Sequence, residues 1–276
     1  MKELIQFSSQ PVLQSPSMVV GWNLDASHLG SKITDYLIRK LGGQFFCEIE
    51  PVEFFSMAGV AIENDLVQFP ETRFYACPDS ELVILKSTPP GYEWYKFLNL
   101  ILDVAQHNCH VKELYTVGGM VALGAHTAPR QLFATPNSAE FKDILSYYQI
   151  TRDMNYESPP GQQPTLNSFL SWTAKTRNIP AANLWVPIPF YLLAVDDPRA
   201  QKVVLEFLAR RLDLLIDLSD VDEEIRKQNE KMGRLRANSP EIDKCISKLE
   251  SNLRLSEGEN EELVKQVEEF LRETRD

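Results

Sequence analysis

Two glycines, a histidine and an arginine lie close together in the sequence and could do chemistry if they shared a site. Gly118 and Gly119 follow a run of strand-forming residues, and His126 and Arg130 come a few positions later. Glycine backbone N–H groups can approach an anion closely, arginine can clamp it, and histidine can act as a general acid or base. The group therefore suggests a site for a small anionic or nucleoside-like substrate.

Each of these residues also has a purely structural interpretation. The glycine pair is expected to form a tight turn from strand to helix that needs positive φ. No carboxylate lies in residues 118–131 to orient the second ring nitrogen of His126. The chain also lacks a Gly-x-x-x-x-Gly-Lys-Ser/Thr phosphate loop. We therefore expect turn glycines and a structural histidine bonded to the backbone, and no catalytic residue unless His126 finds a partner elsewhere.

The other nucleophilic and metal-ligating residues are scattered. No serine lies in a Gly-x-Ser-x-Gly elbow. The cysteines form no Cys-x-x-Cys pair, which argues against a disulfide framework and a zinc site. These are Cys47, Cys77, Cys109 and Cys245. We expect reduced thiols, no metal and no cofactor.

Charge and hydropathy limit the partners of the chain. Its 28 basic and 39 acidic residues give a net charge of -11, which argues against binding nucleic acid or an anionic membrane surface. No stretch approaches the roughly 18 to 20 apolar residues of a membrane span, and the amino terminus lacks the features of a signal peptide. The sequence thus predicts a cytoplasmic protein with protein or small-molecule partners.

The composition changes near Asp197-Pro198. Residues 201–276 hold 33 of the 67 charged residues but only two of the 27 aromatic ones, Phe207 and Phe270. We therefore predict an α/β domain over residues 1–197 and a charged helical domain over residues 198–276.

Apolar runs in the first part alternate with amphipathic segments. Strands are expected over 18–22, 44–49, 82–85, 113–117, 133–135 and 183–186, and helices over 29–41, 93–108, 138–147 and 164–178. This rhythm predicts an α/β fold with a sheet covered by helices on both faces.

The last part of the chain contains helix start and stop signals. Its capping residues and apolar stripes predict helices over 198–216, 219–237, 240–254 and 257–273. A heptad-like spacing from Ile242 to Phe270 leaves one continuous coiled-coil helix as the alternative. Gly258 favours a break, because glycine costs about 1 kcal/mol inside a helix.

The apolar run that contains Pro187 and Pro189 is expected to form a contact surface for a partner. Pro187 and Pro189 cannot donate to a sheet ladder, so the strand they interrupt should end at a sheet edge. This leaves Phe190 and Tyr191 available to a protein partner or a second copy of the chain. The apolar edge should be covered by the helix beginning at Pro198 or by that second subunit.

Several short segments occur in a characteristic order. They are Val19-Val20-Gly21-Trp22, Lys86-Ser87-Thr88-Pro89, Val117-Gly118-Gly119, His126-Thr127-Ala128-Pro129-Arg130, Ala134-Thr135, Tyr156-Glu157-Ser158-Pro159-Pro160-Gly161, Asn178-Ile179-Pro180 and Trp185-Val186-Pro187-Ile188-Pro189-Phe190-Tyr191-Leu192. This series resembles the archaeal and bacterial proteasome-assembly-chaperone family over about residues 15–200. The resemblance implies a three-layer α/β/α sandwich with a core like that of purine nucleoside phosphorylases. It also implies a homo-oligomer that needs no nucleotide and has proteasome subunits as partners.

One departure from the family pattern concerns the loop before residue 164. Where members carry Gly-Pro-Thr-Gly this chain has Ser158-Pro159-Pro160-Gly161, and Pro160 removes a hydroxyl and a backbone donor. The resemblance thus favours a non-enzymatic assembly chaperone or scaffold. The alternative is an enzyme whose cleft is built around Gly118, Gly119, His126 and Arg130.

Overall fold

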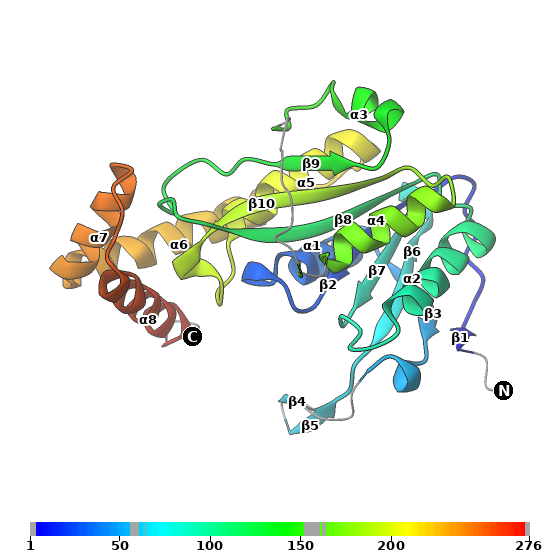
Figure 1. Cartoon of the computed structure of the whole chain (residues 1–276), viewed down its shortest axis with the longest axis horizontal. Coiled ribbons are helices and arrows are strands. Elements are labelled where there is room, and N and C mark those ends of the chain that lie inside the picture. The colour runs from blue at the N-terminus through cyan, green and yellow to red at the C-terminus, as the bar shows by residue number, and fades with distance from the viewer. Residues whose placement is uncertain (1–3, 56–60, 64, 152–160, 162–163, 274–276) are drawn as a thin grey trace.

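The computed structural model describes residues 4–55, 61–63, 65–151, 161 and 164–273. Most of the expected loop segment, Tyr156 to Pro160, lies outside these residues. The main strands are β1 (Ile5–Phe7), β2 (Ser17–Trp22), β3 (Gln44–Ile49), β6 (Thr72–Cys77), β7 (Leu82–Ser87), β8 (Glu113–Ala122), β9 (Phe133–Pro136) and β10 (Ala181–Pro189). They form one eight-stranded mixed sheet in the order β1-β3-β6-β7-β2-β8-β10-β9 (Figure 1).

The centre of this sheet is parallel and its edges are antiparallel. β7, β2, β8 and β10 run parallel to one another, whereas β1, β3, β6 and β9 pair antiparallel with their neighbours. The carboxyl ends of β2, β8 and β10 therefore meet at one end of the sheet, where open α/β sheets carry their ligand sites.

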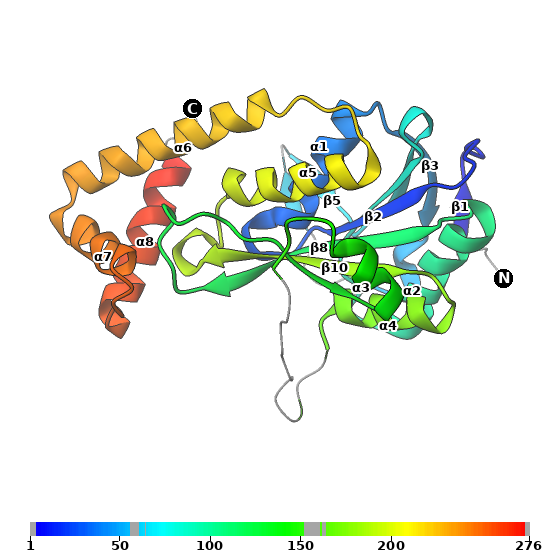
Figure 2. The same ribbon diagram turned by 90° about the horizontal axis from the view of Figure 1, so that it is seen from above.

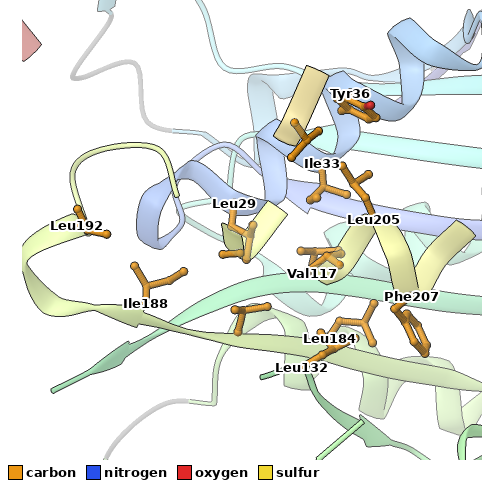
Figure 3. Packing of buried hydrophobic residues seen from close by; sticks show 14 of the residues in the cluster. Leu29, Ile33, Tyr36, Val117, Leu132, Leu184, Ile188, Leu192, Leu205 and Phe207 are labelled. Carbon is orange, nitrogen blue, oxygen red and sulfur yellow. The ribbon is translucent and has the colours of Figure 1, made fainter. Parts of the chain in front are cut away.

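Helices lie on both faces of the sheet (Figure 2). The helices that touch it are α1 (Leu29–Lys40), α2 (Trp94–Asp103), α3 (Ala139–Leu145), α4 (Leu166–Thr176) and α5 (Pro198–Leu212). Val19 of β2 belongs to the cluster packed by α1 and α5, while its neighbours Met18 and Val20 belong to the cluster packed by α2 and α4. Figure 3 shows the first cluster, with Ile33 and Leu205 over the sheet residue Val117. This alternation confirms the α/β class, because successive strand residues point to opposite faces.

The remaining helices extend beyond the sheet. They are α6 (Ser219–Asn238), α7 (Pro240–Glu250) and α8 (Glu257–Glu273), which with α5 confirm the four expected carboxy-terminal helices. α7 and α8 are separate, so the continuous coiled coil is wrong. α7 ends at Glu250, and Ser256 caps the start of α8, because its hydroxyl accepts from the Glu259 N–H and its own N–H donates to the Glu259 carboxylate at 2.9 Å.

The carboxy-terminal helices share their apolar cluster with the sheet. Leu208 of α5, Met232 of α6, Ile246 of α7 and Val267 of α8 are buried in the cluster that contains Val19. The division into domains 1–197 and 198–276 stays a prediction, as does the likeness of the core to purine nucleoside phosphorylases. Among the described residues, no helix is both long and apolar enough to cross a bilayer.

One local prediction is wrong, and one hairpin was not predicted. β8 does not end before Gly118 but continues to Ala122, so the glycine pair lies inside a strand instead of a turn. A small hairpin of β4 (Ala61–Glu63) and β5 (Leu66–Gln68) stands away from the main sheet and has no counterpart among the expected elements (Figure 1).

Candidate functional site

The glycine pair is required by close packing, not by backbone conformation. Neither glycine has positive φ. A Cβ atom on Gly118 would lie 2.7 Å from the Trp185 ring and 2.9 Å from the amide nitrogen of Asn167. On Gly119 it would lie 2.8 Å from the carbonyl oxygen of Ala26. The space beside both glycines is therefore filled by the protein's own groups.

The backbone of Gly119 does bind an anion, but that anion is a side chain of the chain itself. The Gly119 N–H donates to both carboxylate oxygens of Asp25, with N–O distances of 3.0 and 3.2 Å. The N–H groups of Ala26 and Gly30 donate to the same carboxylate at 2.8 and 3.3 Å. Burial raises the Asp25 pKa to about 6, against the lowering effect of these hydrogen bonds. Asp25 is thus mainly ionised at neutral pH and occupies the position that an anionic ligand would take.

His126 is buried and pairs with a tyrosine. Its backbone N–H donates to the Tyr191 hydroxyl oxygen at 2.6 Å, and its Nδ1 lies 2.8 Å from the same oxygen. The hydroxyl oxygen accepts from the backbone, and the direction of its second hydrogen bond, to Nδ1, is set by the tautomer of the ring. Burial, with the nearby Arg130 charge, lowers the His126 pKa to about 4. The ring is neutral at pH 7, and its partner is a side-chain hydroxyl instead of the expected backbone group.

Arg130 ties a loop to a helix. Its Nε donates to Asp197 at 2.8 Å, and both side chains are almost completely buried. Asp197 also caps α5 by accepting from the Ala200 N–H at 3.1 Å. A second guanidinium nitrogen donates to the Ala128 carbonyl at 3.0 Å. Arg130 is thus engaged at the start of α5, and no contact brings it to the glycine pair.

The carboxy-terminal helices close over this region. Thr127, next to His126, donates to Glu250 of α7 at 3.0 Å. α8 packs against the short 3-10 turn Phe190–Leu192 (η5), which follows β10. Tyr191 is only 2% exposed, so its expected availability to a partner is wrong. Phe190 is half-buried in the same cluster, and its contact with a partner stays a prediction.

The apolar strand end is covered by two helices of the same chain: α5, as expected, contacts β10, and α8 contacts the η5 turn that follows it. β10 pairs with both β8 and β9 over Ala182–Trp185, and beyond Trp185 it pairs with β8 alone. The strand therefore does reach a sheet edge at its two prolines, as the sequence predicted.

Sequence reasoning missed the residues that fill the site. Asp25 directly follows a buried strand and precedes a helix, which is a position that often binds backbone N–H groups. Ser27 donates to the Val195 carbonyl at 2.6 Å, and it and His28 both adopt left-handed backbone conformations, with φ of 58° and 51°. The loop after β2 is thus locked to the loop before α5.

The remaining candidates do not form a reactive cluster. The four cysteines are free and buried, and burial raises the pKa of Cys47 to about 12 and of Cys77 and Cys109 to about 11. These thiols stay protonated and poorly reactive at neutral pH. Over the described residues, no three His, Cys, Asp or Glu side chains gather as metal ligands.

The mixed α/β sheet can now be compared with known families. Residues 18–236 match the PAC2 family, and the chain belongs to it. The resemblance noted from the ordered segments is therefore confirmed at the level of the family.

Solved structures share the fold at low sequence identity. A protein of unknown function from Corynebacterium glutamicum is 19% identical, with a TM-score of 0.76 over 90% of this chain and 96% of that one. A proteasome-assembly chaperone homologue from Mycobacterium tuberculosis is 18% identical, with a TM-score of 0.68 over 83% and 99%. An archaeal proteasome activator from Pyrococcus furiosus is 21% identical, with a TM-score of 0.67 over 84% and 98%. No curated protein matches the chain.

Proposed function

We propose that this chain is a non-enzymatic assembly chaperone that binds another protein and holds it for assembly. The observation that carries the proposal is the Gly119–Asp25 contact, because the backbone donor suited to an anionic substrate is occupied by the chain's own carboxylate. His126 and Arg130 are likewise used to join loops and helices. Membership of the PAC2 family and the names of its structural neighbours support a chaperone-type role. The enzyme alternative is not favoured.

The partner that these neighbours suggest is a proteasome subunit, bound in the cytoplasm. The test is to mix the purified chain with separately purified proteasome α and β subunits of the same organism and to record native mass spectra. We expect a stoichiometric complex with free subunits that disappears once the assembled particle forms. Absence of any complex, together with turnover of a small anionic or nucleoside-like substrate, would replace the proposal with the enzyme alternative.

We also propose that the chain works as a homo-oligomer in which Phe190 contributes to the contact. A net charge of -11 opposes association at long range, so an apolar contact is needed. Light scattering at micromolar concentration in 0.15 M salt should show a dimer or larger species that Phe190→Glu weakens without unfolding the protein. Leu253→Glu, at a side chain that is 58% exposed, is the matched control. A monomeric wild type would remove this part of the proposal.

A further inference from the structure

Five aromatic side chains gather on the outer side of α2 and α4. These helices pack against each other on one face of the sheet, away from α7 and α8 (Figures 1 and 2). We call this group the aromatic face, and it consists of Tyr92, Trp94, Tyr95, Phe169 and Trp172. Tyr92, Tyr95 and Trp172 are 57%, 56% and 53% exposed. Trp172 therefore presents about half of its surface to solvent instead of packing fully into the core.

The rings form a continuous surface. The centroids of Tyr95 and Phe169 lie 6.4 Å apart with ring planes 26° from parallel, and those of Phe169 and Trp172 lie 5.6 Å apart. Beside them is a hollow of about 280 Å³ lined by Tyr92, Trp94, Phe169 and neighbouring residues that include Pro164. Trp94, Tyr95 and Trp172 each contact the Phe169 ring, so this part of the face is preformed and needs little ordering on binding.

The aromatic face also offers unused hydrogen-bond donors. The Trp94 indole N–H is engaged with the Pro90 carbonyl at 2.9 Å. Within the described residues, by contrast, the Trp172 indole and the Tyr92 and Tyr95 hydroxyls make no hydrogen bond. A ligand that supplies acceptors next to apolar surface would complement these donors.

Two neighbouring basic side chains are already paired. Lys96 of α2 forms an ion pair with Glu53, and Arg177, just after α4, donates to Asp103 at 2.7 Å. These basic groups therefore provide little attraction for an acidic ligand. The aromatic face fits a ligand that is apolar and uncharged.

The size of the aromatic face fits a peptide better than a second copy of the chain. An aromatic side chain contributes about 150–250 Å² when fully buried, so three that are just over half exposed offer about 250–400 Å². A stable protein interface needs about 800 Å² from each partner. The aromatic face alone falls well short of that area.

We propose that the aromatic face binds an extended, proline-rich segment of a partner protein. Such a segment adopts the polyproline II conformation, which leaves its carbonyl groups without internal hydrogen bonds and presents flat pyrrolidine rings. The rings of Tyr95, Phe169 and Trp172 would pack on the prolines while the free donors bind the carbonyls, as in aromatic grooves that recognise such peptides. Strand addition is excluded here because the backbones of α2 and α4 are already bonded within the helices.

The test uses a capped ten-residue polyproline peptide and an equally long Gly-Ser peptide. The probe signals are the indole ¹⁵N–H resonances of the full chain, with the Trp172 signal assigned from Trp172→Phe. We expect the polyproline peptide to shift that signal saturably while the Gly-Ser peptide does not. Trp172→Ala, monitored by intrinsic tyrosine fluorescence, should weaken binding about tenfold or more. Tyr147→Ala, at an 89% exposed ring outside the aromatic face, should leave the affinity unchanged.

Three results would overturn the proposal. They are no saturable shift at millimolar peptide, an equal response to the Gly-Ser peptide, and a dimer that Trp172→Ala converts to a monomer. The last result would identify a second copy of the chain as the occupant. None of these results depends on whether proteasome subunits bind, so the test is independent of the proposed function. Circular dichroism spectra of both alanine variants should match the wild type, since both side chains are exposed.

Discussion

The hydrogen-bonded pair of His126 and Tyr191 allows a quantitative test of whether His126 has a structural role. The Tyr191 hydroxyl accepts from the His126 backbone N–H at 2.6 Å and forms a second hydrogen bond with Nδ1 of the ring at 2.8 Å. Replacing His126 by alanine keeps the first contact and removes the second. The buried hydroxyl then loses its hydrogen-bond partner on the ring, which costs about 1–3 kcal/mol of unfolding free energy.

Urea unfolding at pH 7.5, followed by circular dichroism, should compare wild type, His126→Ala, Tyr191→Phe and the double variant. Because both single variants break the same contact, we expect a coupling energy of about 0.5–3 kcal/mol. Tyr147→Phe removes an exposed hydroxyl and should be neutral. Strict additivity of the two substitutions would refute the interpretation, as would unchanged stability in His126→Ala with loss of a measurable turnover.

His126 also makes the unfolding free energy depend on pH, with a definite sign. The His126 pKa is about 4 in the native protein against 6.5 for an unperturbed histidine, so the unfolded chain binds more protons between these values. The His126 contribution to stability is therefore complete above pH 6.5 and is lost as the pH falls toward 4, by about 3 kcal/mol in total. The wild type should lose more stability than His126→Ala between pH 7.5 and 5. Identical pH slopes in both proteins would contradict the burial of a neutral ring.

Further substitutions test the other contacts at the carboxyl ends of the strands. Gly119→Ala should destabilise the protein in thermal unfolding, because its Cβ would collide with backbone, whereas Gly233→Ala in α6, with nothing within 4 Å, should stabilise it by up to about 1 kcal/mol. Asp25→Ala leaves backbone N–H groups unpaired and should cost about 1–3 kcal/mol at pH 7. Burial raises the native Asp25 pKa to about 6, so the native state binds more protons than the unfolded chain between pH 3.8 and 6. The difference in unfolding free energy between the wild type and Asp25→Ala should therefore shrink as the pH rises through this range, which is opposite in sign to the histidine effect. Arg130→Met should cost about 3–5 kcal/mol in urea unfolding by leaving Asp197 buried without its partner, and adding Asp197→Asn should recover part of the loss.

Local sequence signals determined the positions of most helices and central strands. The helix expected over 29–41 is α1 (Leu29–Lys40), and the helix expected over 257–273 is α8 (Glu257–Glu273). Gly42, with φ of 63°, ends α1 as the sequence indicated. Caps, glycines and apolar periodicity act within a few residues, so they can be read without knowing the fold.

The role of the glycine pair could not be read in this way. A Cβ atom is excluded at Gly118 and Gly119 because residues far away in the sequence approach them closely. Trp185 and Ala26 are the groups that fill this space. A turn glycine and a close-contact glycine look the same in sequence, since the difference is set by the neighbours that the sheet order brings together.

The burial of Tyr191 was likewise decided by tertiary structure. Its apolar surroundings and adjacent prolines are visible in the sequence, and they correctly indicated a strand end that needs a cover. Which element supplies that cover depends on how α6 and α7 carry α8 back onto the η5 turn, more than sixty residues later. The sequence by itself determined that an apolar surface had to be buried, whereas only the packed chain decided that its own last helix would bury it.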